Sequence, residues 1–341
     1  ALYMIPRKLN ELYTKGGKIF TQNLSENNNG LDFYNEKLFL KPDNKTSLKF
    51  LFNVFIQLIK TKIFNKFYFN QWILLFKISE KDGLSKSFFR FKRITPAKDR
   101  FWADPFILEQ NDIYYIFFEE LIFNENRGKI SLIKMDKKGN YSKPLTVLEE
   151  KFHLSYPFVF KEKDSFYMIP ETKEKNSINL YECVQFPDKW KHKKILIPNI
   201  SAVDSTLLKH GNRFWIFCNV VNNKNYSNND ELYIYFSESL LDSSWTPHPM
   251  NPVVSDVRSA RPAGKIFKYK NKIYRPSQDC SKRYGHSVKF NQIVKINENV
   301  YEEIVVDSIL PNWSNEIVCS HTFNNSGRLT VIDAQIKRFK F

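Results

Sequence analysis

From about residue 71 onward, the chain alternates short apolar runs with polar turns. Runs such as QWILLFKI, IYYIFFEE, RFWIFCNV and ELYIYFS are rich in aromatic and β-branched residues, and turns such as EQND, KEKD and KHGN separate them. Residues of these types favour strands, and short runs bounded by turn residues are typical of an all-β chain. The pattern therefore predicts many short strands over residues 71–341.

The preceding segment has a different pattern. Residues 1–45 are polar and irregular, whereas apolar residues recur at helical spacing between residues 46 and 67, with lysines among them. We predict an N-terminal extension over residues 1–70 that contains an amphipathic helix at about 46–67. Two interpretations of this helix stay open: it docks on the main domain, or it makes peripheral contact with an anionic membrane surface.

A repeat with a period of about 50 residues runs through the strand region. FWADPFILEQNDIYYIFFEE aligns with LSYPFVFKEKDSFYMIPET, and three later segments repeat the order of polar motif, strand, turn and aromatic strand. Such a period with several strands per unit is typical of a β-propeller. Five units predict five blades, and QWILLFKI is expected to close the ring with the last blade. A pair of β-sandwiches is the competing fold.

The polar motif of each unit begins with a chemically distinctive residue. These residues are Asp104, Tyr156, Asp204, Arg261 and His321. Because equivalent positions of propeller blades converge on one end of the central axis, we expect the five side chains to be neighbours. A titratable cluster of this kind is a candidate functional site. In the alternative interpretation, the residues satisfy strand ends and pair with one another as ion pairs.

Composition narrows the classes of function. The formal net charge is +16, only 10 glycines occur, and neither a GxGxxG nor a Walker-type loop is present. The positive charge favours anionic partners, although a lysine-rich surface explains part of it. The four cysteines form no CxxC pair, which argues against a zinc or disulfide framework and fits a reducing compartment. We expect a cytoplasmic location, with peripheral attachment at the inner face of the membrane left open.

The acidic residues and His321 are candidate catalytic groups. Glycosidic bond cleavage needs two carboxyl groups, one of them protonated. Asp104 is a candidate base, Asp204 a second carboxylate and Glu171 a candidate acid, while His321 is a candidate acid or base near neutral pH. No set of metal ligands has a recognisable spacing, so we predict no metal site or cofactor, with a divalent cation on Asp104 and Asp204 left open.

A basic segment runs from Arg258 to Lys289 and contains a single acid, Asp279. Because the planar guanidinium of arginine suits contact with phosphate or carboxylate, the segment predicts an anion-binding wall. The candidate donor-binding residues are Arg258, Arg261, Arg275, Gln278, Asp279, Arg283, Tyr284 and His286. Alternatively, the first two arginines neutralise nearby aspartates such as Asp204 and Asp256.

Aromatic residues complete the candidate site. Trp102 and Tyr156, in the motifs of the first two units, are candidate platforms for stacking on sugar rings. Nucleic acid is an unlikely partner, because aromatic and basic residues interleave in one motif only and no recognised module is present.

Two families resemble this sequence. The DP before a strand in the first unit and the DSTLL of the third look like the five-bladed propeller glycosidases of families 43 and 32. That resemblance implies an aspartate base or nucleophile, a second aspartate that tunes acidity, and a general-acid glutamate in the fourth blade. At the position of that glutamate this chain has DVRSARPAG, which contains Arg258 and Arg261 instead.

A closer resemblance is to the propeller domain at the N-terminus of plant glucosamine inositolphosphorylceramide transferases and their bacterial relatives. It covers about residues 95–335 and is carried by FWADPF, YIFFEE, HLSYPFVF, YMIPE, LYE, DSTLL, HPMNPV, DVRSARPAG and YRPSQDCSKRYGHSV. The resemblance implies a role in cell-surface glycan assembly. In the plant proteins, the glycosyltransferase chemistry is usually placed in a different, C-terminal domain.

Together these features predict a transferase acting on glycans, or the acceptor-recognising part of one, in cell-surface polysaccharide or glycolipid biosynthesis. The expected partners are a glycan acceptor and a phosphate-activated donor such as a nucleotide sugar. Two alternatives stay open: a family 43-like glycoside hydrolase, and a non-catalytic carbohydrate-binding propeller.

Overall fold

The computed structural model describes Leu9, residues 12–14 and 16–17, and then residues 41–81, 83–85, 87–221, 227–241 and 244–341. The chain divides into two units, residues 1–66 and residues 67–341. The division falls a few residues before the expected boundary at residue 70, because the first strand already begins at Tyr68. The expected irregular segment before the helix lies mostly outside the described residues.

Helix α3 (Asn44–Phe67) is the main described element of the first unit. Asp43 caps its N-terminus, since its Oδ1 accepts a hydrogen bond of 2.7 Å from the backbone N–H of Thr46. Apolar and polar positions separate around the helix only up to about Thr61. Lys62 and Lys66 then lie on the apolar side, so the predicted amphipathic pattern does not extend to the end of the helix.

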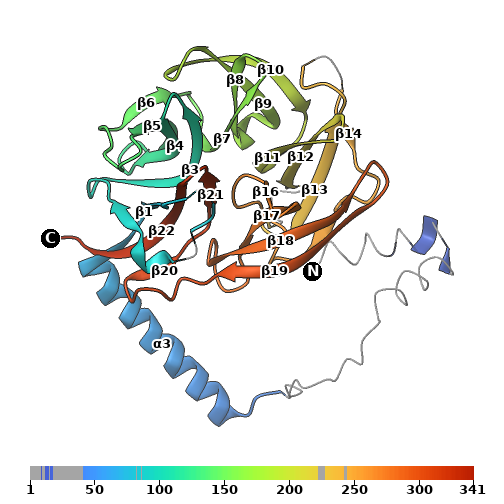
Figure 1. Ribbon diagram of the computed structural model, residues 1–341. Helices are drawn as coiled ribbons and strands as arrows, with labels where there is room; N and C mark the ends of the chain where they lie inside the picture. Colours follow the sequence, from blue (N-terminus) through green and yellow to red (C-terminus); the bar gives the residue numbers. More distant parts are fainter. Residues whose placement is uncertain are drawn as a thin grey trace. The chain divides into compact units, whose positions relative to one another are not determined.

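The second unit is a five-bladed β-propeller, as predicted, with antiparallel sheets around a common centre (Figure 1). Blade 1 contains β3 (Arg100–Gln110), β4 (Ile113–Ile122), β5 (Arg127–Met135) and β6 (Leu145–Leu148). Blade 2 contains β7 (Ser155–Glu162), β8 (Ser165–Glu171), β9 (Ser177–Gln185) and β10 (Lys189–Pro198). Blade 3 contains β11 (Ala202–His210), β12 (Arg213–Val220), β13 (Glu231–Ser237), β14 (Thr246–Pro247) and β15 (Val254–Ser255).

Blade 4 contains β16 (Phe267–Tyr269), β17 (Lys272–Asp279), β18 (Ser287–Ile296) and β19 (Tyr301–Ile309). Blade 5 combines strands from both ends of the unit: β1 (Tyr68–Ile78), β2 (Lys92–Ile94), β20 (Ile317–Cys319), β21 (Phe323–Ser326) and β22 (Leu329–Phe339). Two short 3₁₀ turns, Phe88–Arg90 and Lys173–Lys175, lie outside the sheets.

Strands β1 and β22 close the ring. They pair antiparallel without a register shift, from Tyr68 opposite Phe339 to Ile78 opposite Leu329. The prediction that QWILLFKI joins the last blade is therefore confirmed, and the β-sandwich alternative is wrong.

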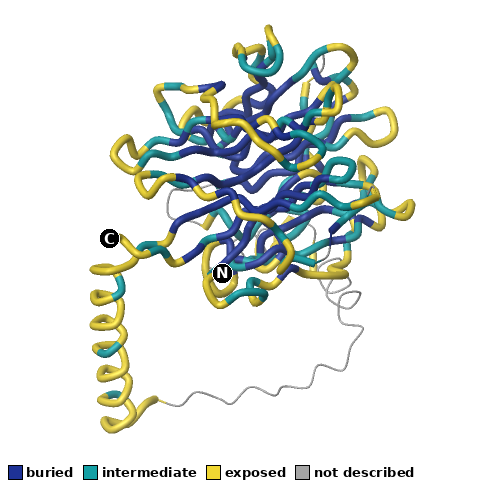
Figure 2. The backbone as a smooth tube through the Cα atoms, turned by 60° about the vertical axis from the view of Figure 1, so that its left-hand side comes forward, coloured by how far each residue is buried: buried dark blue, intermediate teal, exposed yellow. Residues whose placement is uncertain are grey.

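The apolar core lies between neighbouring blades. Because each sheet packs against two others, its middle strands are buried on both faces, and they therefore read as nearly continuous apolar runs in the sequence. Phe117 of β4 and Ile216 of β12 are fully buried in one cluster that joins blades 1 to 3, and smaller clusters join the other pairs. Figure 2 shows this distribution, with buried residues along the strands and exposed residues at the turns.

Candidate functional site at the centre of the propeller

The first strands of blades 1, 2 and 3 share a bulge at the same position. The register shifts between Ala103 and Phe106 in β3, and equivalent shifts occur in β7 and β11. At each bulge one residue adopts a left-handed backbone: Asp104 (φ 51°), Tyr156 (φ 44°) and Asp204 (φ 52°). This conformation is unfavourable for residues other than glycine, so the surrounding sheet must hold it. A bulge changes the direction of a side chain, and here Asp104, Tyr156 and Asp204 lie at equivalent bulges of three blades.

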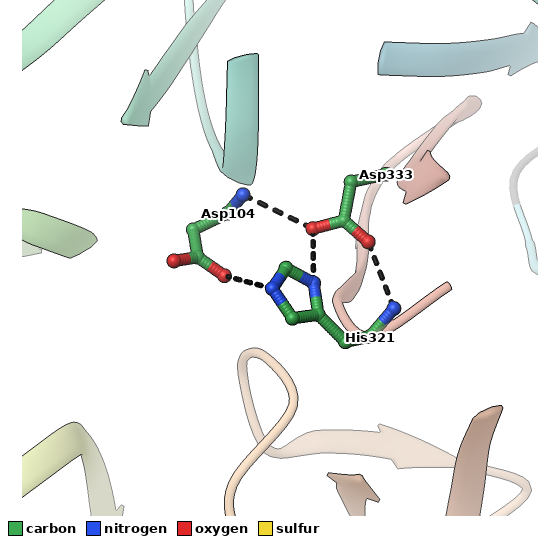
Figure 3. A group of neighbouring side chains, drawn as sticks. All are labelled: Asp104, His321 and Asp333. Carbon is green, nitrogen blue, oxygen red and sulfur yellow. Dashed lines mark hydrogen bonds and ion pairs between the residues drawn. The ribbon is translucent and has the colours of Figure 1, made fainter. Parts of the chain in front are cut away.

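His321 links two aspartates from different strands (Figure 3). Its Nδ1 lies 2.6 Å from Oδ2 of Asp333, on β22, and its Nε2 lies 3.8 Å from Oδ1 of Asp104. Asp333 also accepts the backbone N–H groups of His321, Thr322 and Asp104, at 2.9, 3.0 and 3.1 Å. These contacts use the acceptor capacity of the Asp333 carboxylate. Asp333 is therefore a positioning residue that fixes both His321 and the backbone of Asp104.

Burial and charge set the protonation of this group. Burial, reinforced by nearby carboxylates against the opposing charge of His321, raises the pKa of Asp104 to about 7. Burial alone would lower the pKa of His321, but Asp333 and Asp104 raise it to about 9. Although burial acts in the other direction, His321 holds the pKa of Asp333 below its ordinary value. Near neutral pH, Asp104 is thus the member of the group that titrates.

One oxygen of Asp104 is engaged and the other is not. The Thr322 hydroxyl donates a hydrogen bond of 2.7 Å to Oδ1, the oxygen that also faces His321. Among the residues that the structure describes, no hydrogen-bond partner contacts Oδ2. Asp104 therefore combines a fixed orientation with one oxygen that can accept a proton.

The second aspartate, Asp204, is bound by Arg261 and Gln278. Its Oδ2 accepts hydrogen bonds from Arg261 Nε at 2.5 Å and from Gln278 Nε2 at 2.9 Å. Arg261 Nη1 also donates to Oδ1 of Asn229 at 2.9 Å, and Asp204, Arg261 and Gln278 are all buried. The interpretation of Arg261 as a partner that neutralises an aspartate thus fits the geometry better than a guanidinium reserved for a ligand.

Two other arginines of the expected anion wall lie in ion pairs away from this cluster. Arg258 is exposed and binds Asp256 through Nε and Nη2, at 2.9 and 2.7 Å. Arg275 is fully buried and binds both carboxylate oxygens of Glu303, at 2.8 and 2.6 Å, and the backbone carbonyl of Ser259. The structure therefore does not bring these two side chains to the centre, because local carboxylates bind them instead.

The remaining residues of that wall belong to the turn between β17 and β18. Asp279 accepts hydrogen bonds from Ser281 and lies 3.4 Å from the ammonium group of Lys289. Arg283 is exposed, and burial together with the positive charges of Lys282 and Arg283 lowers the pKa of His286. This turn carries cationic side chains at the surface beside the central cluster.

Neither predicted stacking residue presents an open ring. Trp102 is buried against Phe118 and donates through Nε1 to Glu120 at 3.0 Å. Tyr156 is fully buried, and its hydroxyl bonds to Thr206 Oγ1 at 2.8 Å and accepts the backbone N–H of Gly264 at 2.7 Å. Trp102 is thus held within blade 1 and Tyr156 links blade 2 to blade 3, and neither buried ring can stack on a ligand.

Tyr284, unlike Trp102 and Tyr156, is exposed as well as close to the central cluster. It lies edge-on to His321, with ring centroids 5.4 Å apart, and the Arg261 guanidinium lies 4.8 Å from its centroid. The residue is nevertheless 46% exposed. Tyr284 is therefore an aromatic residue beside His321 whose ring is partly open to solvent.

Glu171 approaches the centre from the second strand of blade 2. It pairs opposite Ser155, the residue before the bulge, as Glu119 does opposite Ala103 in blade 1. Burial, and then the charge of Asp204, raises the pKa of Glu171 to about 8. Glu171 is thus a carboxylic acid that keeps its proton at neutral pH. Glu119 instead contacts the imidazole of His153, at 3.2 Å.

Several residues of the site are absent from the sequence predictions. Asp333 and Thr322 were missed, as was Trp72, whose indole stacks on His321 with centroids 4.0 Å apart. Asp333 left one signal in the sequence: it is an acid inside LTVIDAQI, an otherwise apolar strand, and a buried acid requires partners.

The same cluster has the residue types of a metal site. Ligand atoms of Asp104, His321 and Asp333 all lie within 4.8 Å of one another. However, the oxygens of Asp333 are occupied by N–H donors, and His321 is held in its protonated form between two carboxylates. Asp204, the other residue considered for a cation, is bound by Arg261 and Gln278. The arrangement fits a proton-linked triad better than a cation site.

Comparison with known proteins identifies the family. Residues 93–335 match the family model of the N-terminal domain of glucosamine inositolphosphorylceramide transferase 1. The chain belongs to this family of propeller domains. It is 36% identical over 209 residues to glucosamine inositolphosphorylceramide transferase 1 of Arabidopsis thaliana, covering 60% of this chain and 27% of that protein. For the Oryza sativa subsp. japonica protein, identity is 35% over 210 residues, with coverages of 61% and 28%.

The chain thus spans little more than a quarter of the length of the curated relatives it matches. Among solved structures, the catalytic domain of the Coprinopsis cinerea GH62 α-L-arabinofuranosidase has a TM-score of 0.51 and 10% identity. The match covers 77% of this chain and 97% of that one. At this identity the likeness concerns the fold alone.

Proposed function

We propose that this propeller is a glycan-active component of a glycosyl-transfer system, which binds a glycan or glycolipid acceptor at Asp104. The observation that carries the proposal is the buried triad of Asp333, His321 and Asp104, which ends in a carboxyl group that titrates near neutral pH. A general base works best when its pKa lies near the working pH. The name of the matched relatives, which joins glucosamine with the phosphate-bearing lipid inositolphosphorylceramide, supports a glycolipid acceptor.

In the proposed step, Oδ2 of Asp104 takes the proton of an acceptor hydroxyl. The hydroxyl oxygen forms a bond to the anomeric carbon of the donor sugar, and the bond from that carbon to the leaving phosphate oxygen breaks. The phosphate departs with the bonding electron pair. His321, protonated and held by Asp333, stabilises the ionised form of Asp104 before the transfer, and Tyr284 offers a face for the sugar ring.

We further propose that the donor sugar is activated by a phosphate group. Because Arg261 is bound by Asp204, the anion contact is assigned to Arg283 and Lys282, which are exposed in the turn that also carries Tyr284. Exposed cationic groups bind phosphate mainly through charge, so donor binding is expected to weaken as salt concentration rises.

The test is a calorimetric titration of the chain with a panel of nucleotide sugars and with glycerophosphoinositol, a soluble inositol phosphate. We expect saturable, salt-sensitive binding that Tyr284→Ala weakens at least tenfold and that Asp104→Asn leaves nearly intact. In a transfer assay with donor and acceptor together, Asp104→Asn is expected to lower the rate at least a hundredfold.

Asp112→Asn is the matched control, because Asp112 also has a left-handed backbone but lies exposed in the turn after β3. It is expected to change neither binding nor transfer. Binding without transfer that is insensitive to Asp104→Asn would identify a carbohydrate-binding propeller instead. The absence of binding across the whole panel would contradict the proposal.

A second candidate, a glycoside hydrolase, is favoured by Glu171. A carboxyl group with a pKa of about 8 can donate a proton to a leaving sugar oxygen while Asp104 acts on a water molecule. A hydrolase releases the aryl group from aryl glycosides without a donor or an acceptor. Both Asp104→Asn and Glu171→Gln should abolish that release, whereas the transferase proposal predicts no release by the unaltered protein.

A further inference from the structure

Helix α3 carries a broad apolar surface over its first four turns. We call this surface the apolar face; its members are Leu48, Leu51, Phe52, Phe55, Leu58 and Ile59. At about 100° per residue these positions fall within one sector around the axis. The opposite side carries Lys49, Asn53, Gln57 and Lys60, together with one exposed apolar residue, Phe50. Leu48, Phe52 and Leu58 are 67%, 63% and 64% exposed, so no described residue of the first unit covers the face.

The charge of the helix has one sign. Its 24 residues include five lysines, at positions 45, 49, 60, 62 and 66, and no aspartate or glutamate. The lysines lie toward both ends, so cationic groups flank the apolar face along the axis. Long lysine side chains can extend to reach water or lipid head groups while their stems lie along apolar surface. The helix therefore combines an apolar face with a positive charge that favours an anionic surface.

We propose that α3 docks in the interface of an anionic membrane, with the apolar face among the acyl chains and the lysines at the head groups. Burial of apolar area and attraction to anionic lipid act together in such helices. A second copy of α3 fits the apolar face less well, because it would bring ten lysines together without a compensating acid. Insertion across the bilayer does not fit either: among the described residues no helix is long and apolar enough to cross a membrane.

This inference is independent of the chemistry proposed for Asp104, since it rests on the described part of the first unit alone. It assigns the chain a peripheral membrane contact, and it specifies two separate determinants of that contact. Removing apolar residues should weaken binding to any vesicle, whereas removing lysines should weaken binding to anionic vesicles selectively.

The test is co-sedimentation of the full chain with vesicles of phosphatidylcholine alone or mixed with phosphatidylglycerol. We expect strong binding to the mixed vesicles at moderate salt and much weaker binding to vesicles of phosphatidylcholine alone. Lys49→Gln combined with Lys60→Gln should weaken binding to the mixed vesicles about fivefold per lysine. Leu51→Gln combined with Phe55→Gln should weaken it roughly tenfold per side chain.

Matched controls lie on the propeller. Lys268→Gln with Lys295→Gln removes the same charge, and Val294→Gln with Ile304→Gln removes exposed apolar surface from β18 and β19. Both are expected to leave vesicle binding unchanged.

The unfolding free energy of each variant shows whether the apolar face packs against protein instead of lipid. If the α3 variants destabilise the chain or change its oligomeric state while vesicle binding stays the same, the face packs on protein and the proposal is wrong. Equal binding to both kinds of vesicle by all variants would also overturn it.

Discussion

The two sides of the propeller centre each hold one aspartate, and the two aspartates have different kinds of partner. On one side, Asp104 faces His321, a group whose charge depends on pH, and one oxygen of the carboxylate has no partner among the described residues. On the other side, Asp204 faces Arg261, which is always charged, and shares Gln278 as a further donor. Both aspartates have the same bulged, left-handed backbone.

The difference separates a chemical role from a structural one. A buried carboxylate with a permanent guanidinium partner has its charge compensated and its position fixed. Burial and the charge of His321 together set the pKa of Asp104 to about 7, so this carboxyl group can take up and release a proton at neutral pH. We infer that the Asp204 side supports the centre and that the Asp104 side acts, although the same strand geometry builds both.

The largest expected effect comes from breaking the structural side. Arg261→Met leaves Asp204 buried without its cation, and we expect a loss of about 3–5 kcal/mol in the free energy of unfolding. Urea unfolding measures it. The control is Arg258→Met, which breaks an exposed pair with Asp256 and should cost no more than about 1 kcal/mol. Equal losses in the two variants would contradict a supporting role for the buried pair.

The pH dependence of stability tests the titratable side. The pKa of His321 is about 9 in the folded protein and 6.5 ordinarily, so its stabilising contribution is complete below about pH 6.5 and disappears as pH rises toward 9. The unfolding free energy should therefore fall between pH 7 and 9, by up to about 1.4 kcal/mol per pH unit.

His321→Gln should remove the slope between pH 8 and 9, because Asp104 and Glu171, with pKa values of about 7 and 8, contribute to the slope only at lower pH. His286→Gln should not remove it, because the pKa of His286 is shifted in the opposite direction. Urea unfolding across this pH range provides the measurement. A slope between pH 8 and 9 that survives in His321→Gln would assign the titration to another group.

The smallest expected effect comes from Gly285, which lies beside His321 on the titratable side of the centre. Gly285 has φ 61°, and a Cβ there would lie 2.8 Å from the Cβ of His321. Gly211 has the same φ with nothing within 4 Å, so Gly211→Ala measures the backbone strain alone. We expect Gly285→Ala to cost about 1–2 kcal/mol more than that control, as for modest overpacking, and to shift the pH dependence assigned to His321. Identical unfolding curves would show that the turn yields without moving His321.

Much of the fold was readable from the sequence because a propeller repeats itself. The spacing of the polar motifs predicted five blades, and the leftover strand QWILLFKI predicted the ring closure. The same repeat singled out Asp104, Asp204, Arg261 and His321, which the structure brings into two contacting pairs. A repeat aligns positions around an axis, so it can identify which residues converge.

The pairing of side chains was not readable, because it depends on angles and distances that no repeat encodes. Arg275 and Arg261 occupy similar motifs, yet Arg275 is bound by Glu303, which lies 28 positions away on β19, two strands across the sheet. Asp333 lies on β22, away from the first position of the polar motif in its unit, so the repeat alone does not align it with Asp104. The exposed aromatic residue could not be predicted for the same reason. Tyr284 is exposed and Tyr156 is buried, although both are tyrosines.

The pairing of β1 with β22 has a consequence for how the site comes into being during synthesis. β1 leaves the ribosome before all five blades are complete, and it must wait with an unpaired edge until β22 arrives. Asp333 lies on β22, so the triad at the centre forms in the same event that closes the ring. Nascent chains that lack β22 should have neither a closed ring nor an assembled triad, which couples completion of the domain to formation of the triad.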